Sequence, residues 1–67
     1  MPKISLEAVR VNAGMSQKEW AKKLGVSNNT VINWEKGNTE PTLSQVREMS
    51  LLSGIPMDFI FAPDKFN

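Results

Sequence analysis

The sequence predicts a small all-α domain built from short helices, and three observations support this prediction. Apolar residues recur at spacings of three and four, and no segment shows the alternation that is typical of a strand. Serine or threonine residues that can cap a helix precede these segments, and glycine residues follow them. Because 67 residues suffice for only one core, residues 1–67 are expected to form a single domain.

The first two helices are marked at both of their ends. Ser5 can cap a helix that runs to about residue 13 with one apolar stripe, and Gly14 ends it. Residues 16–19 (SQKE) form a capping box, in which the serine and the glutamate each bond the backbone amide of the other. The second helix is expected to end at Gly25.

The second half of the chain predicts two more helices and an apolar tail. Ser27 can cap a third helix that ends at Gly37. Residues 42–45 (TLSQ) form another capping box, and the fourth helix closes at about Gly54. The apolar tail, residues 55–67, is expected to begin with one or two further helical turns.

Residues 17–36 have the spacing of two short helices that cross through a tight turn. Gly25 permits a left-handed backbone at the corner, and Ala21 is small enough to let the helices approach closely. Apolar side chains can fill the angle between the helices, and they are Trp20, Leu24, Val26, Val31 and Trp34. This unit predicts a helix-turn-helix over about residues 17–36.

The third helix has an apolar face and an amide-rich face. At about 100° per residue, Val31 and Trp34 define the inward face. If this helix lies in the major groove of DNA, an asparagine on the outer face can pair with adenine, and an isoleucine can contact a thymine methyl group. The alternative for the asparagines is a role in capping or in the solvent-facing surface. The candidate base-reading residues are Asn28 at the tip of the helix, followed by Asn29, Ile32 and Asn33.

The composition excludes several classes of function. Cysteine and histidine are absent, and the acidic residues are scattered singly, so we expect no metal site, no catalytic residues, no cofactor and no small-molecule ligand. No apolar run approaches the roughly 20 residues that cross a bilayer, so a cytoplasmic protein is expected. Residues 1–37 hold six of the eight basic residues and three of the seven acidic ones, which suggests that this half faces a polyanion.

The segment QKEWAKKLGVSNNTVINWEKG resembles the helix-turn-helix of the phage repressor and Cro family, DNA-binding domains similar to lambda repressor. The resemblance extends to residues 5–13, which match the first helix, and to PTLSQVREMSLLSGIPMDFIF, which matches the fourth and fifth. It implies a compact five-helix bundle. It also implies a Cro-like or repressor-type regulator, of phage or prophage origin, that binds operator DNA with its third helix in the major groove.

The N-terminus of the second helix suits a DNA phosphate, and the resemblance implies further phosphate contacts in the loop after the third helix. In this loop, Glu40 departs from the basic residue that many relatives carry. The predicted phosphate contacts are Gln17, Lys18, Lys36, Asn38 and Thr42. The resemblance also implies a partly buried structural ion pair between Arg10 and Glu35.

The expected partners are double-stranded DNA and a second copy of the chain. The resemblance implies a homodimer on a two-fold symmetric operator, and the apolar tail offers residues for either the core or the dimer contact: Met57, Phe59, Ile60 and Phe61. A different class of function stays open, a protein-interaction module such as an antitoxin or antirepressor. An exposed Ile32 and the acidic second half of the chain are the observations that favour it.

Overall fold

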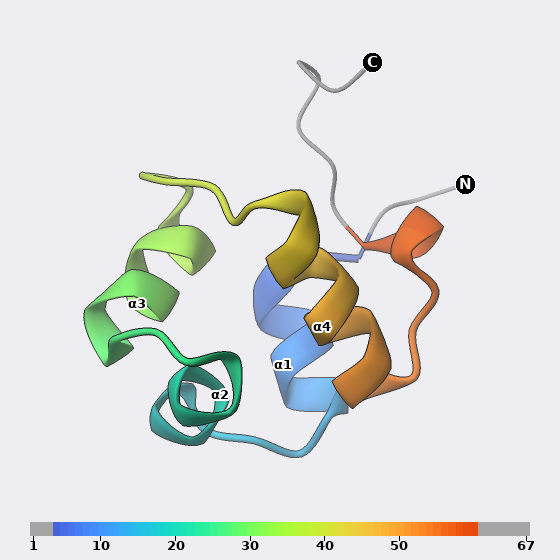
Figure 1. Cartoon of the computed structure of the whole chain (residues 1–67), viewed down its shortest axis with the longest axis horizontal. Coiled ribbons are helices and arrows are strands. Elements are labelled where there is room, and N and C mark those ends of the chain that lie inside the picture. Colours follow the sequence, from blue (N-terminus) through green and yellow to red (C-terminus); the bar gives the residue numbers. More distant parts are fainter. Residues whose placement is uncertain (1–3, 61–67) are drawn as a thin grey trace.

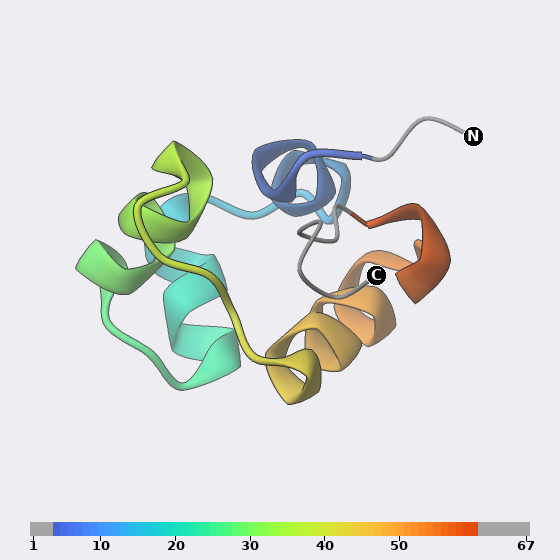
Figure 2. The same ribbon diagram turned by 90° about the horizontal axis from the view of Figure 1, so that it is seen from above.

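The computed structural model describes residues 4–60, which form four α-helices and one short 3₁₀ turn (Figure 1). The elements are α1 (Leu6–Asn12), α2 (Gln17–Leu24), α3 (Asn28–Lys36), α4 (Leu43–Ser53) and the 3₁₀ turn η1 (Met57–Phe59). Two views at right angles place α2 and α3 together on one side of the molecule and α1 with α4 beside them (Figures 1 and 2). The helix-turn-helix therefore forms one flank of the fold.

Each helix begins at the capping residue that the sequence predicts. The side chains of Ser5, Ser16, Ser27 and Thr42 accept hydrogen bonds from the backbone amide three residues later, at 3.1–3.2 Å. Both capping boxes are complete, because the amides of Ser16 and Thr42 donate to the Glu19 and Gln45 side chains at 2.9 and 2.7 Å. These caps satisfy backbone donors that a helix leaves free at its start.

The turn between α2 and α3 depends on a left-handed glycine. Gly25 has φ 72° and ψ 30°, a conformation that costs other L-residues energy. The chain then folds back, and the amide of Val26 donates to the carbonyl of Ala21 at 3.0 Å. Gly37 ends α3 in the same way with φ 82°. Both helices of the motif therefore stop where the sequence predicts.

The core draws on every helix of the described chain. The two tryptophans lie in it, one from α2 and one from α3, and they are 1% and 6% exposed. Shorter residues from α1 and α4 complete the packing, which joins the helix-turn-helix to the rest of the fold. The buried apolar residues are Leu6, Val9, Trp20, Ala21, Val31, Trp34, Val46, Met49 and Ile60.

The predicted fifth helix is wrong in form, because residues 57–59 make only a single 3₁₀ turn. Ile60 then takes an extended backbone and forms an isolated parallel bridge with Ile4, whose amide donates to the carbonyl of Phe59 at 2.6 Å. Ile60 is 0% exposed. It belongs to the core, and this corrects its assignment as a possible dimer contact. Phe61 lies outside the described residues.

Candidate nucleic-acid interface

Helix α3 buries one face and presents its amide-bearing tip to solvent. Val31 and Trp34 are buried against the core, whereas Asn28 and Asn29 are exposed. The tip is held by Ser27, whose side chain caps the amide of Thr30 and lies 2.8 Å from the Thr30 hydroxyl. Two exposed amides therefore project from a helix start whose backbone is fixed.

The other two predicted base-reading residues are less accessible. Ile32 is half-buried, which corrects the expectation that it is exposed. Helix α3 packs against both α1 and α2, but Ile32 is not part of the core cluster. Asn33 is also half-buried. Only part of each of these two side chains therefore faces solvent.

The side chain of Asn33 has a partner that the sequence did not suggest. Its Oδ1 accepts a hydrogen bond from Nδ2 of Asn38 at 3.3 Å, and its backbone carbonyl accepts one from the amide of Asn38 at 2.9 Å. A predicted base-reading residue and a predicted phosphate contact are thus joined across Gly37. The pairing depends on how the chain reverses after α3, which residue spacing alone does not fix.

The predicted phosphate contacts differ in exposure. Lys18, Lys36, Asn38 and Thr42 are exposed, and Gln17 is half-buried. The Thr42 hydroxyl accepts the capping bond from Gln45 at 3.2 Å, but its own O–H can still donate to another acceptor.

The first turn of α2 has two free backbone donors. The capping box uses the amides of Ser16 and Glu19, and the amides of Gln17 and Lys18 have no acceptor among residues 4–60. Hydrogen bonds from the backbone amide of Ser16 and from its side chain hold the pKa of the Glu19 carboxyl below its usual range. Free amides and the positive end of the helix dipole make this turn suitable for an anion.

A hydrogen-bonded network links α1, α2 and α3 beneath this turn. The Glu35 carboxylate accepts from Arg10 through Nε at 2.7 Å and through Nη2 at 3.3 Å. The Nη1 atom of Arg10 donates to the carbonyl of Met15 at 2.9 Å. The Arg10 and Glu35 side chains are 12% and 8% exposed, so the resemblance placed this pair at residues that do lie together.

Gln17 also belongs to this network, which the sequence did not predict. Its Nε2 atom donates to Oε1 of Glu35 at 3.0 Å, and the two residues are 18 positions apart in the chain. The predicted phosphate contact is therefore bonded to the predicted ion pair. The only signal in the sequence was that Gln17 and Glu35 both occupy positions that the resemblance singles out. No pattern in the sequence indicated that their side chains bond to each other.

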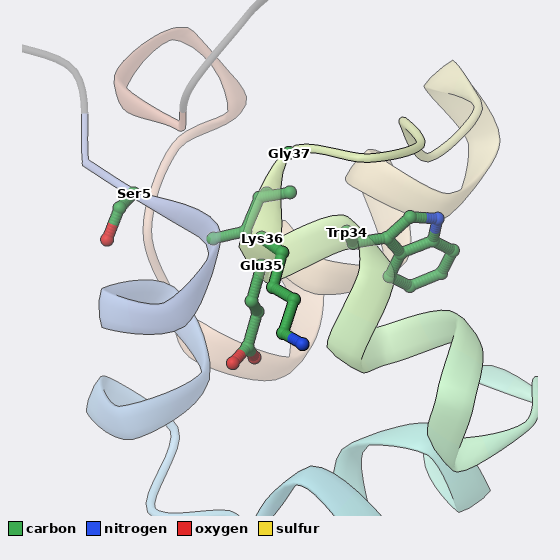
Figure 3. A pocket seen from close by; sticks show the side chains of 6 residues that line it. Ser5, Trp34, Glu35, Lys36 and Gly37 are labelled. Atoms are coloured by element: carbon green, nitrogen blue, oxygen red, sulfur yellow. The ribbon is translucent and has the colours of Figure 1, made fainter.

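A shallow cleft of about 220 Å³ lies between the start of α1 and the end of α3 (Figure 3). It is lined by Ser5, Leu6, Trp34, Glu35, Lys36 and Gly37. Among residues 4–60, no three acidic side chains gather as a metal site would require. In the same part of the chain, no helix is both long enough and apolar enough to cross a bilayer.

The geometry of α2 and α3 defines a helix-turn-helix protein, and comparison with known proteins agrees. Residues 6–60 match the Helix-turn-helix family, so the chain belongs to this family. The match confirms the resemblance found in the sequence. No solved structure gave a significant match.

Three curated relatives match nearly the whole chain. The HTH-type transcriptional regulator ImmR of Bacillus subtilis is 32% identical over 60 residues, 90% of this chain and 47% of that protein. An uncharacterized HTH-type transcriptional regulator of Methanocaldococcus jannaschii is 36% identical over 59 residues, 88% of this chain and 89% of that protein. The cryptic phage CTXphi transcriptional repressor RstR of Vibrio cholerae is 30% identical over 59 residues, 88% of this chain and 53% of that protein. The chain thus spans about half the length of ImmR and RstR.

Proposed function

We propose that this protein is a sequence-specific DNA-binding transcriptional regulator of the Cro-like or repressor type. The observation that carries the proposal is the arrangement of α3, which buries Val31 and Trp34 while Asn28 and Asn29 project from its capped tip. The names of the three relatives, two regulators and one phage repressor, support it. Such a protein is a regulator and not an enzyme, and it acts in the cytoplasm, where bacterial and phage DNA lies.

In this proposal, the tip of α3 enters the major groove of DNA. Asn28 and Asn29 are exposed and can each pair bidentately with an adenine, a contact worth about 1–3 kcal/mol of discrimination. Ile32 and Asn33 read bases with their solvent-facing parts, through a thymine methyl group and an amide contact respectively. The helix carries a single basic residue, Lys36, so sequence reading and charge attraction are divided between elements.

The DNA backbone is held by the turns on either side of α3. The amides of Gln17 and Lys18 and the two side chains surround one phosphate at the start of α2. Lys36, Asn38 and Thr42 contact the backbone from the end of α3 and the loop that follows. Each neutralised phosphate releases counterions, so affinity falls as salt rises.

The protein is proposed to bind a two-fold symmetric operator as a homodimer. With Ile60 in the core, the half-buried Met57 and Phe59 are the residues of η1 left for a contact between copies. A two-fold dimer places two α3 helices in successive turns of the major groove. Ile32 is half-buried and offers less apolar surface to a protein partner than an exposed residue would, so DNA binding is the function we advance. The acidic second half of the chain is the remaining observation that favours a protein-interaction module.

Selection from a pool of random duplexes tests the proposal. We expect a two-fold symmetric motif that binds with a salt-dependent affinity, falling by a factor of ten or more between about 50 and 200 mM salt. An asymmetric single motif would contradict the dimer but keep the base reading. The absence of salt-sensitive binding at low ionic strength would refute DNA binding itself.

A further inference from the structure

The buried carboxylate of Glu35 holds the side chain that stands at the proposed phosphate site. Oε1 of Glu35 is 3.0 Å from Nε2 of Gln17, and the carboxylate is held in turn by two bonds from Arg10. We propose that Glu35 is a positioning residue for DNA binding, which acts by fixing the amide group of Gln17 toward a phosphate. This inference rests on the proposed function.

The chemistry of the pair sets the orientation of Gln17. A carboxylate only accepts hydrogen bonds, so the NH₂ group of Gln17, and not its carbonyl oxygen, must face Glu35. One N–H is used in this contact, and the second diverges from it and stays available to an acceptor. A phosphate is such an acceptor. Without Glu35, the amide could turn its carbonyl oxygen toward the phosphate, and the two acceptors would repel each other.

The ion pair with Arg10 offsets the charge of the Glu35 carboxylate close to the proposed phosphate site. An unpaired buried carboxylate near a phosphate would weaken DNA binding, but the bidentate guanidinium offsets its charge. Arg10 also donates to the carbonyl of Met15, just before α2, so the guanidinium is fixed relative to the start of that helix. The network therefore delivers an oriented N–H donor beside the free amides of Gln17 and Lys18.

Replacing Glu35 distinguishes its positioning effect on Gln17 from the electrostatic effect of its charge on DNA binding. Glu35→Gln removes a negative charge, so electrostatics alone predicts tighter binding to DNA. Positioning predicts weaker binding, by about five- to tenfold, since the Gln17 side chain must then be ordered when DNA binds. Glu7→Gln is the matched control: Glu7 is exposed and lies 3.8 Å from the same guanidinium, so its change should alter affinity less than about twofold.

A double-variant cycle tests whether Glu35 acts through Gln17. Gln17→Ala should weaken binding about tenfold, and adding Glu35→Gln to it should produce no further loss. Neutral methylphosphonates placed one at a time in the selected duplex should reveal one phosphate whose neutralisation costs the wild type more affinity than it costs either single variant, in which the backbone amides and Lys18 still contact it. Losses that multiply in the double variant, or a Glu35→Gln variant that keeps the full sensitivity of the wild type to that phosphate, would overturn the proposal.

A measurement on the free wild-type protein covers the case in which Glu35→Gln does not fold. Gln45 offers an internal control, because its Oε1 accepts from Thr42 and its NH₂ group has no acceptor among residues 4–60. In nuclear magnetic resonance spectra, the side-chain NH₂ of Gln17 should exchange with water about tenfold more slowly than that of Gln45. Equal exchange rates would refute the positioning role.

Different results would refute the DNA-binding function and the positioning role of Glu35. If the wild type binds no duplex in a salt-dependent way, the DNA-binding function is wrong, and the slow exchange of Gln17 would remain as a property of the free protein. If the wild type binds and the Gln17–Glu35 cycle is additive, DNA binding holds and the positioning role is wrong.

Discussion

Replacing Gly25 by L-alanine in one synthetic chain and by D-alanine in another isolates the backbone strain at the turn between α2 and α3. Gly25 is exposed, with φ 72° and ψ 30°, and an L-Cβ built there would meet no atom within 4 Å. The L-residue therefore suffers only from the left-handed backbone, at a cost of about 1–2 kcal/mol. D-Alanine favours this conformation. Its restriction of the unfolded chain stabilises the folded protein by about 0.4–1 kcal/mol.

The two enantiomers restrict the unfolded chain equally, so the two chains should differ by the strain alone, about 1–2 kcal/mol in the free energy of unfolding. In a domain of this size that difference separates the thermal midpoints by at least about 4 °C, with the D-alanine chain above the wild type and the L-alanine chain below it. Far-ultraviolet circular dichroism measures all three midpoints. D-Alanine at position 8, in the first turn of α1, is the control and should lower the midpoint. Equal midpoints for the two Gly25 variants would show that the turn carries no left-handed strain.

Four further substitutions address the core, the interface and a cap. Met49→Ala removes a side chain that is 0% exposed and should cost about 2–5 kcal/mol, enough to shift the urea midpoint strongly in so small a domain; a change below about 1 kcal/mol would contradict the observed packing. Asn29→Ala should relax the selected motif at particular base pairs, whereas Lys18→Ala should weaken all duplexes alike and reduce the salt slope by about 1; an unaltered motif for the Asn29 variant would remove that residue from base reading. The Glu19 carboxylate has a lowered pKa because it accepts from the Ser16 amide, so it stabilises the fold above its unfolded pKa and loses this effect as pH falls through the folded one. The stability difference between wild type and Glu19→Gln should accordingly shrink between about pH 6 and pH 3, and a constant difference would contradict the assignment.

The features that the sequence predicted correctly are local ones. A cap such as Ser16 with Glu19 is completed within one helical turn, so its bonds need no knowledge of the rest of the fold. The left-handed glycines are likewise set by the chain next to them, and Gly25 and Gly37 end α2 and α3 where expected. The helix-turn-helix was predictable because nearly all of its determinants fall inside a span of about 20 residues.

The features that the sequence could not predict depend on how distant helices are oriented. Gln17 and Glu35 meet only because α2 and α3 cross at one angle, and a small rotation of either helix would separate them. Ile60 lies in the core and forms its bridge with Ile4, at the opposite end of the described chain, whereas Ile32 is only half-buried and lies outside the core cluster. Apolar content alone could not say which of these residues faces the core.

The bridge between Ile4 and Ile60 brings the two ends of the described chain together. The two positions adjoin. Both views place the neighbouring turn η1 on the side of the molecule away from α3 (Figures 1 and 2). A circular permutant that links Ile4 and Ile60 by a few glycine and serine residues, and opens the chain in the exposed loop at 38–40, would therefore keep the core in place. Cargo attached near Ile4 or Ile60 would likewise emerge away from the proposed recognition surface, but beside the proposed contact between copies at η1.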